Sequence, residues 1–381
     1  MAASVLLTPN LKVEPPSSSA PGELPAGLRR YVEAHFGARL TRVERLGPDA
    51  GAGTSTAKTD GYGLPMHLWL ERPDGSQQQL VFRLAGSNRF GHDRRSDRAQ
   101  EQLLAFDTFG LVDRHVHAVD VGAIDGGGEL TSLSRAQELF LITEWVDGTP
   151  YAEDLRALAH GGTLRALDVQ RTRALASHLA ALHQRLPPDA VAWERCLRDT
   201  VGSGEGLFGV CDAYPEDTPG ASPARLLELE QLATQWRWRL KPKVHRLSRT
   251  HGDFHPFNLV FREGLDFSLL DASRGAQGES ADDVTALAIN YVFFALEHRH
   301  QWSEGFGVLW DTLWSTYLEH SGDEELLDCV APFLAWRAVV VACPRFYPHL
   351  SAVARERLLT FALEALAAPR FDPGLAHRLF P

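Results

Sequence analysis

The chain has 381 residues, enough for about two domains, and its 44% hydrophobic and 23% charged residues are typical of a globular protein. A net charge of −11 without a concentrated basic face argues against a partner that is a nucleic acid or a membrane surface. The apolar run 338–343 is too short to span a membrane, and the first residues lack the features of a secretion signal. The four cysteines have no metal-type spacing, so we expect reduced thiols and a cytoplasmic location.

The N-terminal part predicts a small sheet-rich lobe. Residues 1–25 are rich in proline, serine and alanine and are expected to be disordered. Residues 26–148 are expected to form the lobe, with helices at Leu28–Phe36 and Arg98–Phe109. The strands expected in it are Thr41–Leu46, His67–Leu70, Leu80–Leu84 and Glu138–Glu144.

The rest of the chain, residues 149–381, predicts a larger helical lobe. Leucines recur at helical spacing in 174–186, and the pattern repeats in 223–240. After residue 283 the chain is again helical to about residue 367. The predicted fold class is therefore α+β, with a small antiparallel-sheet lobe before a helical lobe.

The most informative stretch is 251–258, His-Gly-Asp-Phe-His-Pro-Phe-Asn. Asp253 and Asn258 have the spacing of a phosphotransferase catalytic loop, in which the aspartate accepts the proton of the acceptor hydroxyl and the asparagine binds magnesium. Two apolar runs around Arg262-Glu263-Gly264 predict a hairpin that returns Asp271 beside Asn258. Asp271 is then the second candidate ligand, because Mg²⁺ prefers hard oxygen donors. A structural hairpin with surface acids is the alternative interpretation.

Other segments carry weaker signals for nucleotide binding. Residues 51–59 resemble a Walker loop only superficially, because alanines replace both required glycines, and they are either a loop over phosphates or an exposed linker. Arg83 ends a strand and precedes Glu101 on the next helix, as in the cation and acid pair of kinase lobes, although a surface ion pair would look the same. Glu144 and Val146 lie in a connector whose backbone could contact an adenine edge.

Several residues are expected to support the loop. His251 is interpreted as an orienting histidine, and Asp283 either accepts N–H groups of the loop or caps a helix. Trp310, Trp314 and Tyr317 share one helical face, which is typical of core but is also consistent with the wall of an acceptor pocket.

These residues resemble the aminoglycoside phosphotransferase and choline kinase-like family. The resemblance runs through residues 40–300 and includes 81–83, 144–148, 179–183 and 251–283. It implies a protein-kinase-like two-lobed fold and transfer of the γ-phosphoryl group of ATP or GTP to a hydroxyl of a small molecule. It also implies that Asp253 is the catalytic base and that Asn258 and Asp271 bind magnesium.

Further roles follow from the same resemblance. Arg83 takes the place of the strand cation, Glu101 that of its partner and Asp283 that of the acid supporting the loop. The chain departs from the family in having Arg83 instead of lysine, and Ala272-Ser273-Arg274 after Asp271.

The sequence therefore predicts a magnesium-dependent small-molecule kinase, and the alternative is a catalytically weak nucleotide-binding regulator. Acids and aromatics after residue 283, among them Glu297, Asp311 and Glu319, favour an amine-bearing acceptor.

Overall fold

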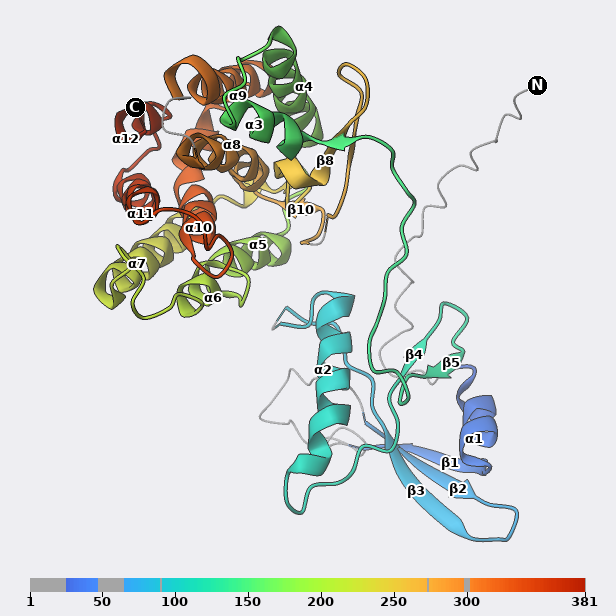
Figure 1. Ribbon diagram of the computed structural model, residues 1–381. Coiled ribbons are helices and arrows are strands. Elements are labelled where there is room, and N and C mark those ends of the chain that lie inside the picture. The colour runs from blue at the N-terminus through green and yellow to red at the C-terminus, as the bar shows by residue number, and fades with distance from the viewer. Residues whose placement is uncertain (1–24, 47–64, 90, 273, 298–301, 381) are drawn as a thin grey trace, which may run out of the picture. The chain divides into compact units, whose positions relative to one another are not determined.

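The computed structural model describes residues 25–380 except 47–64, 90, 273 and 298–301. The chain divides into two compact units, residues 1–142 and 143–381 (Figure 1). The segment 1–25, apart from Pro25, and the loop 51–59 lie outside the described residues. In the described part, no helix is long and apolar enough to cross a membrane.

The N-terminal unit is built on an antiparallel sheet of order β1-β2-β3. Side chains of β2 alternate between buried and half-buried positions, the period expected of a strand with one covered face. Met66, Leu68 and Leu70 of β2 pack with Leu28 and Val32 of α1 in the core of this unit. The elements are α1 (Leu28–Phe36), β1 (Arg39–Arg45), β2 (Met66–Glu71), β3 (Gln77–Phe82), α2 (Arg95–Thr108), the 3₁₀ turn η2 (Phe109–Leu111), β4 (Gly122–Ile124) and β5 (Leu130–Ser132).

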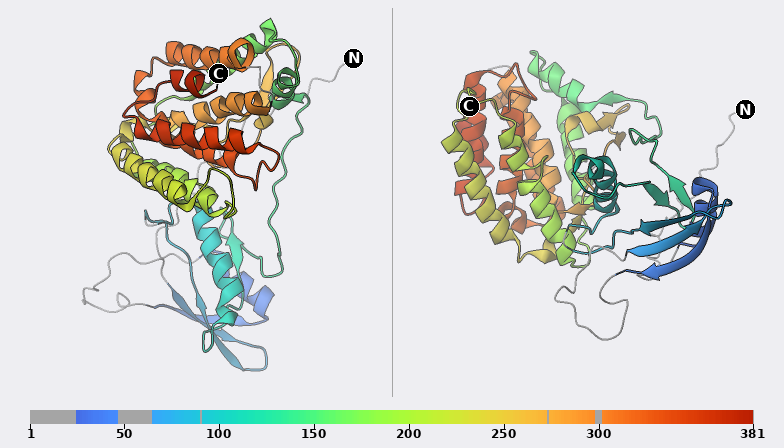
Figure 2. Two further views of the ribbon diagram at one scale, coloured as in Figure 1. Left: turned by 60° about the vertical axis from the view of Figure 1, so that its left-hand side comes forward. Right: turned by 90° about the horizontal axis from the view of Figure 1, so that it is seen from below.

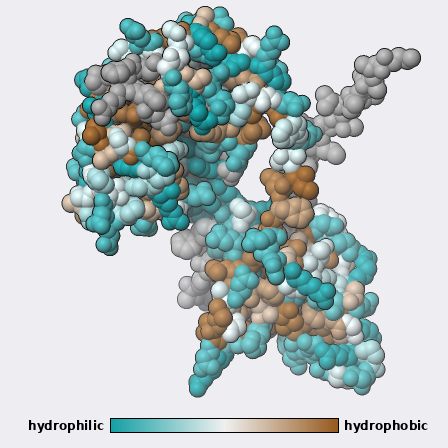
Figure 3. Space-filling model, in the orientation of Figure 1, coloured by the Kyte–Doolittle hydropathy of each residue, from teal (hydrophilic) through white to brown (hydrophobic). Residues whose placement is uncertain are grey.

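One predicted strand is not formed. Residues 138–147 have no regular secondary structure, and Leu139, Phe140, Leu141 and Ile142 are exposed (Figure 3). A strand needs a neighbour to pair its N–H and C=O groups, and no strand in the described residues pairs with this segment. Its β-branched and aromatic composition was therefore misleading.

The C-terminal unit is a helical body with small sheets at one side (Figure 2). α4 packs against α9, and α10 packs against α8 and α11. Its first elements are β6 (Thr149–Pro150), α3 (Tyr151–Ala159), α4 (Ala166–Leu182), α5 (Ala190–Gly202), α6 (Leu207–Asp212), α7 (Pro223–Leu240), η3 (Val244–Arg246), β7 (Ser248–Arg249), η4 (Pro256–Asn258), β8 (Leu259–Phe261), β9 (Phe267–Leu269) and β10 (Gln277–Gly278). The remaining elements are α8 (Ser280–Glu297), the π-helical turn η5 (Trp302–Phe306), α9 (Gly307–Ser321), η6 (Glu324–Asp328), α10 (Val330–Ala342), α11 (Ala352–Ala367) and α12 (Gly374–Leu379).

The residues at the start of α7 explain why this helix begins there. The Ser222 hydroxyl accepts a hydrogen bond from the backbone N–H of Arg225 at 3.3 Å, and Pro223 occupies the first helical position of α7. The helical body, the small antiparallel sheets and the hairpin β8–β9 agree with the predicted α+β class.

Candidate active site

The hairpin places Asp271 next to Asn258. β8 and β9 pair with Leu259 opposite Leu269, and the N–H of Leu270 donates to the carbonyl of Asn258 at 2.9 Å. Asp271 is the next residue, is exposed, and has a φ of +49°. Aspartate is one of the few non-glycine residues that adopts this left-handed conformation.

Asp253 lies in the loop between β7 and η4, and its backbone is fixed by neighbouring side chains. Its N–H donates to Nδ1 of His251 at 3.2 Å. Its carbonyl accepts a hydrogen bond from Nδ2 of Asn258 at 3.1 Å, which leaves the amide oxygen of Asn258 as an acceptor. The loop therefore joins Asp253 and Asn258 directly.

Three cationic or ionisable side chains surround the Asp253 carboxylate, which is 14% exposed. Nη1 of Arg337 donates to Oδ1 at 2.9 Å, Nη2 of Arg274 lies 3.4 Å from the same oxygen, and Nε2 of His255 lies 3.3 Å from Oδ2. Burial alone would raise the pKa of this carboxyl, but the hydrogen bond to His255 and the charges of Arg337 and Arg274 hold it well below its usual range. Asp253 is thus kept as a carboxylate.

Asp283, near the start of α8, binds the beginning of the loop. Its carboxylate accepts the N–H of His251 at 2.7 Å and the N–H of Gly252 at 2.8 Å. It also contacts Nε2 of His183 at 3.1 Å. Despite complete burial, these hydrogen bonds lower the pKa of Asp283. The acceptance of loop N–H groups, one of the two expected geometries for Asp283, is the one found.

Gly252 allows the loop to approach the segment after Asp271. Its φ is +85°, and a Cβ at this position would lie 3.2 Å from Cβ of Arg274 and 3.1 Å from the carbonyl oxygen of Gly275. β7, which precedes the loop, pairs antiparallel with β10, which follows Arg274, and Arg249 lies opposite Gln277. The glycine therefore brings the loop against Arg274.

The structure does not bring all the predicted residues together. Arg83 is exposed just after β3, and in the described residues it forms no ion pair with Glu101. Glu101 on α2 instead lies 3.4 Å from Nε2 of His92. Glu144 is exposed and Val146 half-buried in the irregular segment before β6, and both belong to the C-terminal unit.

The aromatic stripe of α9 is core, which removes one motive for an amine-bearing acceptor. Trp310, Trp314 and Tyr317 are 0%, 3% and 1% exposed, and Tyr317 hydrogen-bonds to Nδ1 of His183 at 2.8 Å. Asp311 pairs with His377 at 2.8 Å, and Glu319 is an exposed residue. The side chain of Glu297 lies outside the described residues. Helical spacing alone could not tell a core stripe from a pocket wall.

Sequence reasoning gave no role to Arg337 or Arg274. Arg337 is 9% exposed within α10, a helix that is otherwise apolar, and Nη2 donates to Asp282 at 2.7 Å. A single arginine in such a run needs a buried partner, and this was a detectable signal. Arg274 stands out only once its neighbours in space are known.

Two further features bear on ligand binding. In the described residues no group of three or more His, Cys, Asp and Glu side chains is placed to hold a metal ion. The donors of Asn258 and Asp271 nevertheless suit a hard cation that completes its shell with phosphate oxygens.

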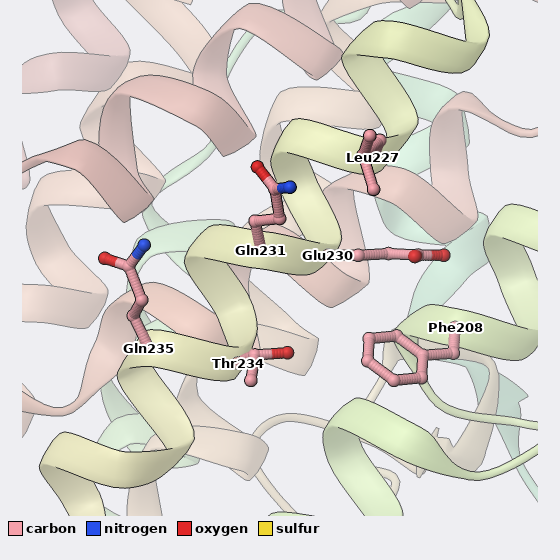
Figure 4. A pocket seen from close by; sticks show the side chains of 6 residues that line it. All are labelled: Phe208, Leu227, Glu230, Gln231, Thr234 and Gln235. Carbon is pink, nitrogen blue, oxygen red and sulfur yellow. The ribbon is translucent and has the colours of Figure 1, made fainter.

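A shallow hollow of about 340 Å³ on α6 and α7 contains none of the predicted site residues (Figure 4). Its lining consists of Phe208, Leu227, Glu230, Gln231, Thr234 and Gln235.

Several small-molecule kinases are among the solved structures that match this chain, all at low sequence identity. An amicoumacin kinase in complex with AMP-PNP, Ca²⁺ and Ami is 14% identical, with 88% of this chain and 94% of that chain covered and a TM-score of 0.40. Two crystal forms of glucosamine kinase differ in coverage. One covers 84% of this chain and 92% of that chain at 14% identity and TM-score 0.40. The other covers 56% and 59% at 17% identity and TM-score 0.37.

An ethanolamine kinase of Plasmodium vivax is 12% identical, with 89% of this chain and 87% of that chain covered and a TM-score of 0.34. Likeness at these values does not identify an activity. No match was found among curated proteins. The family model is more specific, because it matches residues 70–271, more than half of the chain, and spans both Arg83 and Asp271. The chain belongs to the phosphotransferase enzyme family, APH.

Proposed function

We propose that this phosphotransferase moves the γ-phosphoryl group of ATP or GTP to a hydroxyl of a small molecule, with Asp253 accepting the hydroxyl proton. The observation that carries the proposal is the state of Asp253. Its pKa is held well below the usual range by Arg337, Arg274 and His255, it is partly exposed, and it lies in a loop whose N–H groups bind Asp283. Such a carboxylate can accept a hydrogen bond from an alcohol and orient it for attack.

The neighbouring residues have proposed roles in binding the nucleotide. Asn258 and Asp271 would hold a magnesium ion, which when bound neutralises charge on the phosphate oxygens. Arg83, with Glu101, would contact the phosphates, and Glu144 and Val146 would contact the base. These four assignments depend on position in the sequence. His251 and Asp283 would keep the loop in its orientation.

The proposal depends on positioning more than on strong base chemistry. Phosphoryl transfer passes through a loose transition state, so the hydroxyl needs alignment before it needs to lose its proton. A carboxylate with a lowered pKa is a weak base, and it suits a reaction in which the proton leaves late.

Replacing Asp253 by asparagine tests the function. Asp253→Asn retains shape but cannot accept the proton, so we expect kcat to fall about 100- to 10,000-fold. Calorimetric titration with magnesium and ATP should show nearly unchanged binding. Asp266→Asn, at a carboxylate 65% exposed in the turn between β8 and β9, is the matched control. Near-normal turnover by Asp253→Asn would remove Asp253 from this role.

A second candidate is a catalytically weak nucleotide-binding regulator. The observation that favours it is the pairing of Glu101 with His92 instead of with Arg83. The two candidates differ in turnover. Nucleotide binding without phosphorylation of any alcohol, in a coupled assay of ADP release over many hydroxylated metabolites, would select the regulator.

A further inference from the structure

Two arginines share one tryptophan beside Asp253. The guanidinium of Arg274 lies 4.3 Å from the centre of the Trp336 ring, and that of Arg337 lies 4.1 Å from it. Trp336 is 3% exposed, and its indole N–H donates to the carbonyl of Glu205 at 3.0 Å. The ring is therefore fixed, and it holds two planar cations at the candidate base.

The two arginines differ in how well their donors are used. Arg337 donates to Asp253 at 2.9 Å, to Asp282 at 2.7 Å and, over a longer distance, to the carbonyl of Gly252 at 3.4 Å, and in the described residues only its Nε is buried without a partner. It thus links the loop to the start of α8 and has a structural role.

Arg274 has unused donors. Its polar contact to Asp253 is long, at 3.4 Å, and its Nε and Nη1 are buried without a hydrogen-bond partner in the described residues. Burial and the nearby Arg337 lower the pKa of Arg274, whereas the charges of Asp282, Asp253 and Glu205 raise it. Buried donors without partners cost free energy, so they are uncommon unless a ligand satisfies them.

The geometry of the unused donors indicates which ligand fits. A guanidinium binds the two oxygens of a carboxylate or a phosphate through parallel hydrogen bonds from Nη2 together with either Nε or Nη1, and in Arg274 each of these two edges has one donor without a partner in the described residues. An ammonium group would meet two like charges here. It would also find the Trp336 ring, the aromatic face that could bind it, already in contact with both guanidinium groups.

Building on the proposed function, we propose that Arg274 binds an anionic group, carboxylate or phosphate, of the acceptor whose hydroxyl faces Asp253. The acceptor hydroxyl must lie within ~3 Å of Asp253, and Nη2 of Arg274 is 3.4 Å from the same carboxylate. The hydroxyl and the anionic group therefore belong to one compact molecule and are only a few bonds apart. This replaces the amine-bearing acceptor expected from the sequence.

The test compares related alcohols that carry anionic, neutral or cationic groups. One set is glycerate, glycerol 3-phosphate, glycerol and 3-amino-1,2-propanediol, and a second set is glucuronate, glucose 6-phosphate, glucose and glucosamine. Kinetic constants are measured for the full chain with magnesium and ATP. We expect an anionic member to have the highest kcat/KM, and its carboxylate or phosphate identifies the preferred group.

Two substitutions of Arg274 connect that preference to the residue. Arg274→Gln should raise KM for the preferred anionic alcohol about 10- to 100-fold, the effect of losing a charge-assisted hydrogen bond, with a smaller effect on kcat. Arg274→Lys should recover part of the loss, because it supplies the charge without the planar fork. Arg173→Gln, an exposed arginine on α4, controls for the change in net charge.

Three outcomes would overturn the inference, and they can be separated from failure of the proposed function. Best turnover of a neutral or cationic alcohol refutes an anionic acceptor but leaves the kinase intact. An equal loss of kcat for all alcohols in Arg274→Gln would mean that Arg274 acts on the transferred phosphoryl group. Absence of turnover with every alcohol, together with absence of calorimetric binding of magnesium and ATP, would refute both proposals.

Discussion

At the scale of single residues, the candidate site contains two aspartates whose surroundings differ. Asp253 is surrounded by cationic groups that keep it ionised, whereas Asp271 is exposed and in a left-handed conformation. The first arrangement suits a group that orients a hydroxyl. The second suits a ligand whose charge stays available to a cation.

Asp271→Asn should weaken magnesium-dependent nucleotide binding more than Asn258→Ala does. Asparagine tolerates a φ near +49°, so this substitution removes charge without altering the backbone. We expect a loss of about tenfold or more, since even a residue that only hydrogen-bonds to a metal ligand typically contributes about 10- to 100-fold to metal affinity. Calorimetric titration of ATP with and without magnesium measures it, with Asp266→Asn as control. Unchanged magnesium dependence in both variants would refute the metal assignment.

Arg83→Ala should lower nucleotide affinity and kcat, and Arg83→Lys should restore part of both. Lysine keeps the charge but cannot bind phosphate through a planar fork. Arg72→Ala, an arginine on the preceding hairpin that contacts Gln78 at 3.0 Å, is the control. If Arg83 is an exposed side chain that does not contact the nucleotide, Arg83→Ala will change the free energy of unfolding by less than about 1 kcal/mol and leave the kinetic constants unchanged.

At the scale of elements, α8 and α10 hold the loop from two sides. α8 supplies Asp283, which accepts two loop N–H groups, and α10 supplies Arg337, which joins Asp253 to Asp282. Burial raises the pKa of Asp282, and the neighbouring charge of Arg337 opposes that change. Arg337 therefore stabilises two carboxylates that would otherwise be poorly solvated.

Arg337→Met should destabilise the chain by about 3–5 kcal/mol, because it removes the cation that hydrogen-bonds to both Asp253 and Asp282. Adding Asp282→Asn to this variant should restore part of the stability, because it neutralises one of the two carboxylates that lost their hydrogen bond to Arg337. Urea unfolding of the single and double variants measures both effects, and Arg357→Met, an exposed arginine on α11, is the control. Equal stability of Arg337→Met and wild type would contradict the buried linkage.

At the scale of the whole molecule, patterns close together in the chain were predicted well. Helix α1 and helix α7 have the bounds expected from periodicity, and the hairpin β8–β9 forms where turn residues separate apolar runs. The family resemblance is confirmed by the match over residues 70–271. Local spacing is preserved in the fold, so it carries this information.

Features that depend on distant contacts were missed or wrong. The strand expected over 138–144 has no pairing partner among the residues that the structure describes, and Arg337 reaches Asp253 across 84 positions of the chain. Neither fact is encoded in nearby residues. The pairing of the Arg83 cation with the Glu101 carboxylate was likewise predicted from sequence spacing alone. In the structure Glu101 lies beside His92 instead.

The charge distribution predicts that acid destabilises the chain. The pKa values of Asp253, Asp283 and Asp323 are lowered and that of Glu325 is lowered to about 2, whereas those of Asp282 and Glu230 are raised. Carboxyls with lowered pKa stabilise the fold above their unfolded value of about 4, and this stability is lost as pH falls through the folded pKa. The raised groups act in the opposite direction.

The lowered groups are more numerous, so Tm should fall as the pH drops from about 5 to about 2. Asp283→Asn should have a lower Tm at pH 5 but a smaller fall, because one of the titrating groups is gone. Asp113→Asn, at a carboxylate 97% exposed, should behave as wild type. Thermal unfolding followed by circular dichroism measures all three proteins, and an equally steep fall in Asp283→Asn would contradict the role given to Asp283.

The contact of Asp283 with the loop also has a consequence for motion. Surface loops normally unfold locally without unfolding of the rest of the protein, so their amide hydrogens exchange rapidly with deuterium in the solvent. The amides of His251 and Gly252 are instead bonded to a fully buried carboxylate at the start of α8. Their exchange requires separation of the loop from that helix. We therefore expect these two amides to exchange slowly, and under the proposed function the same hydrogen bonds would keep Asp253 in place between turnovers.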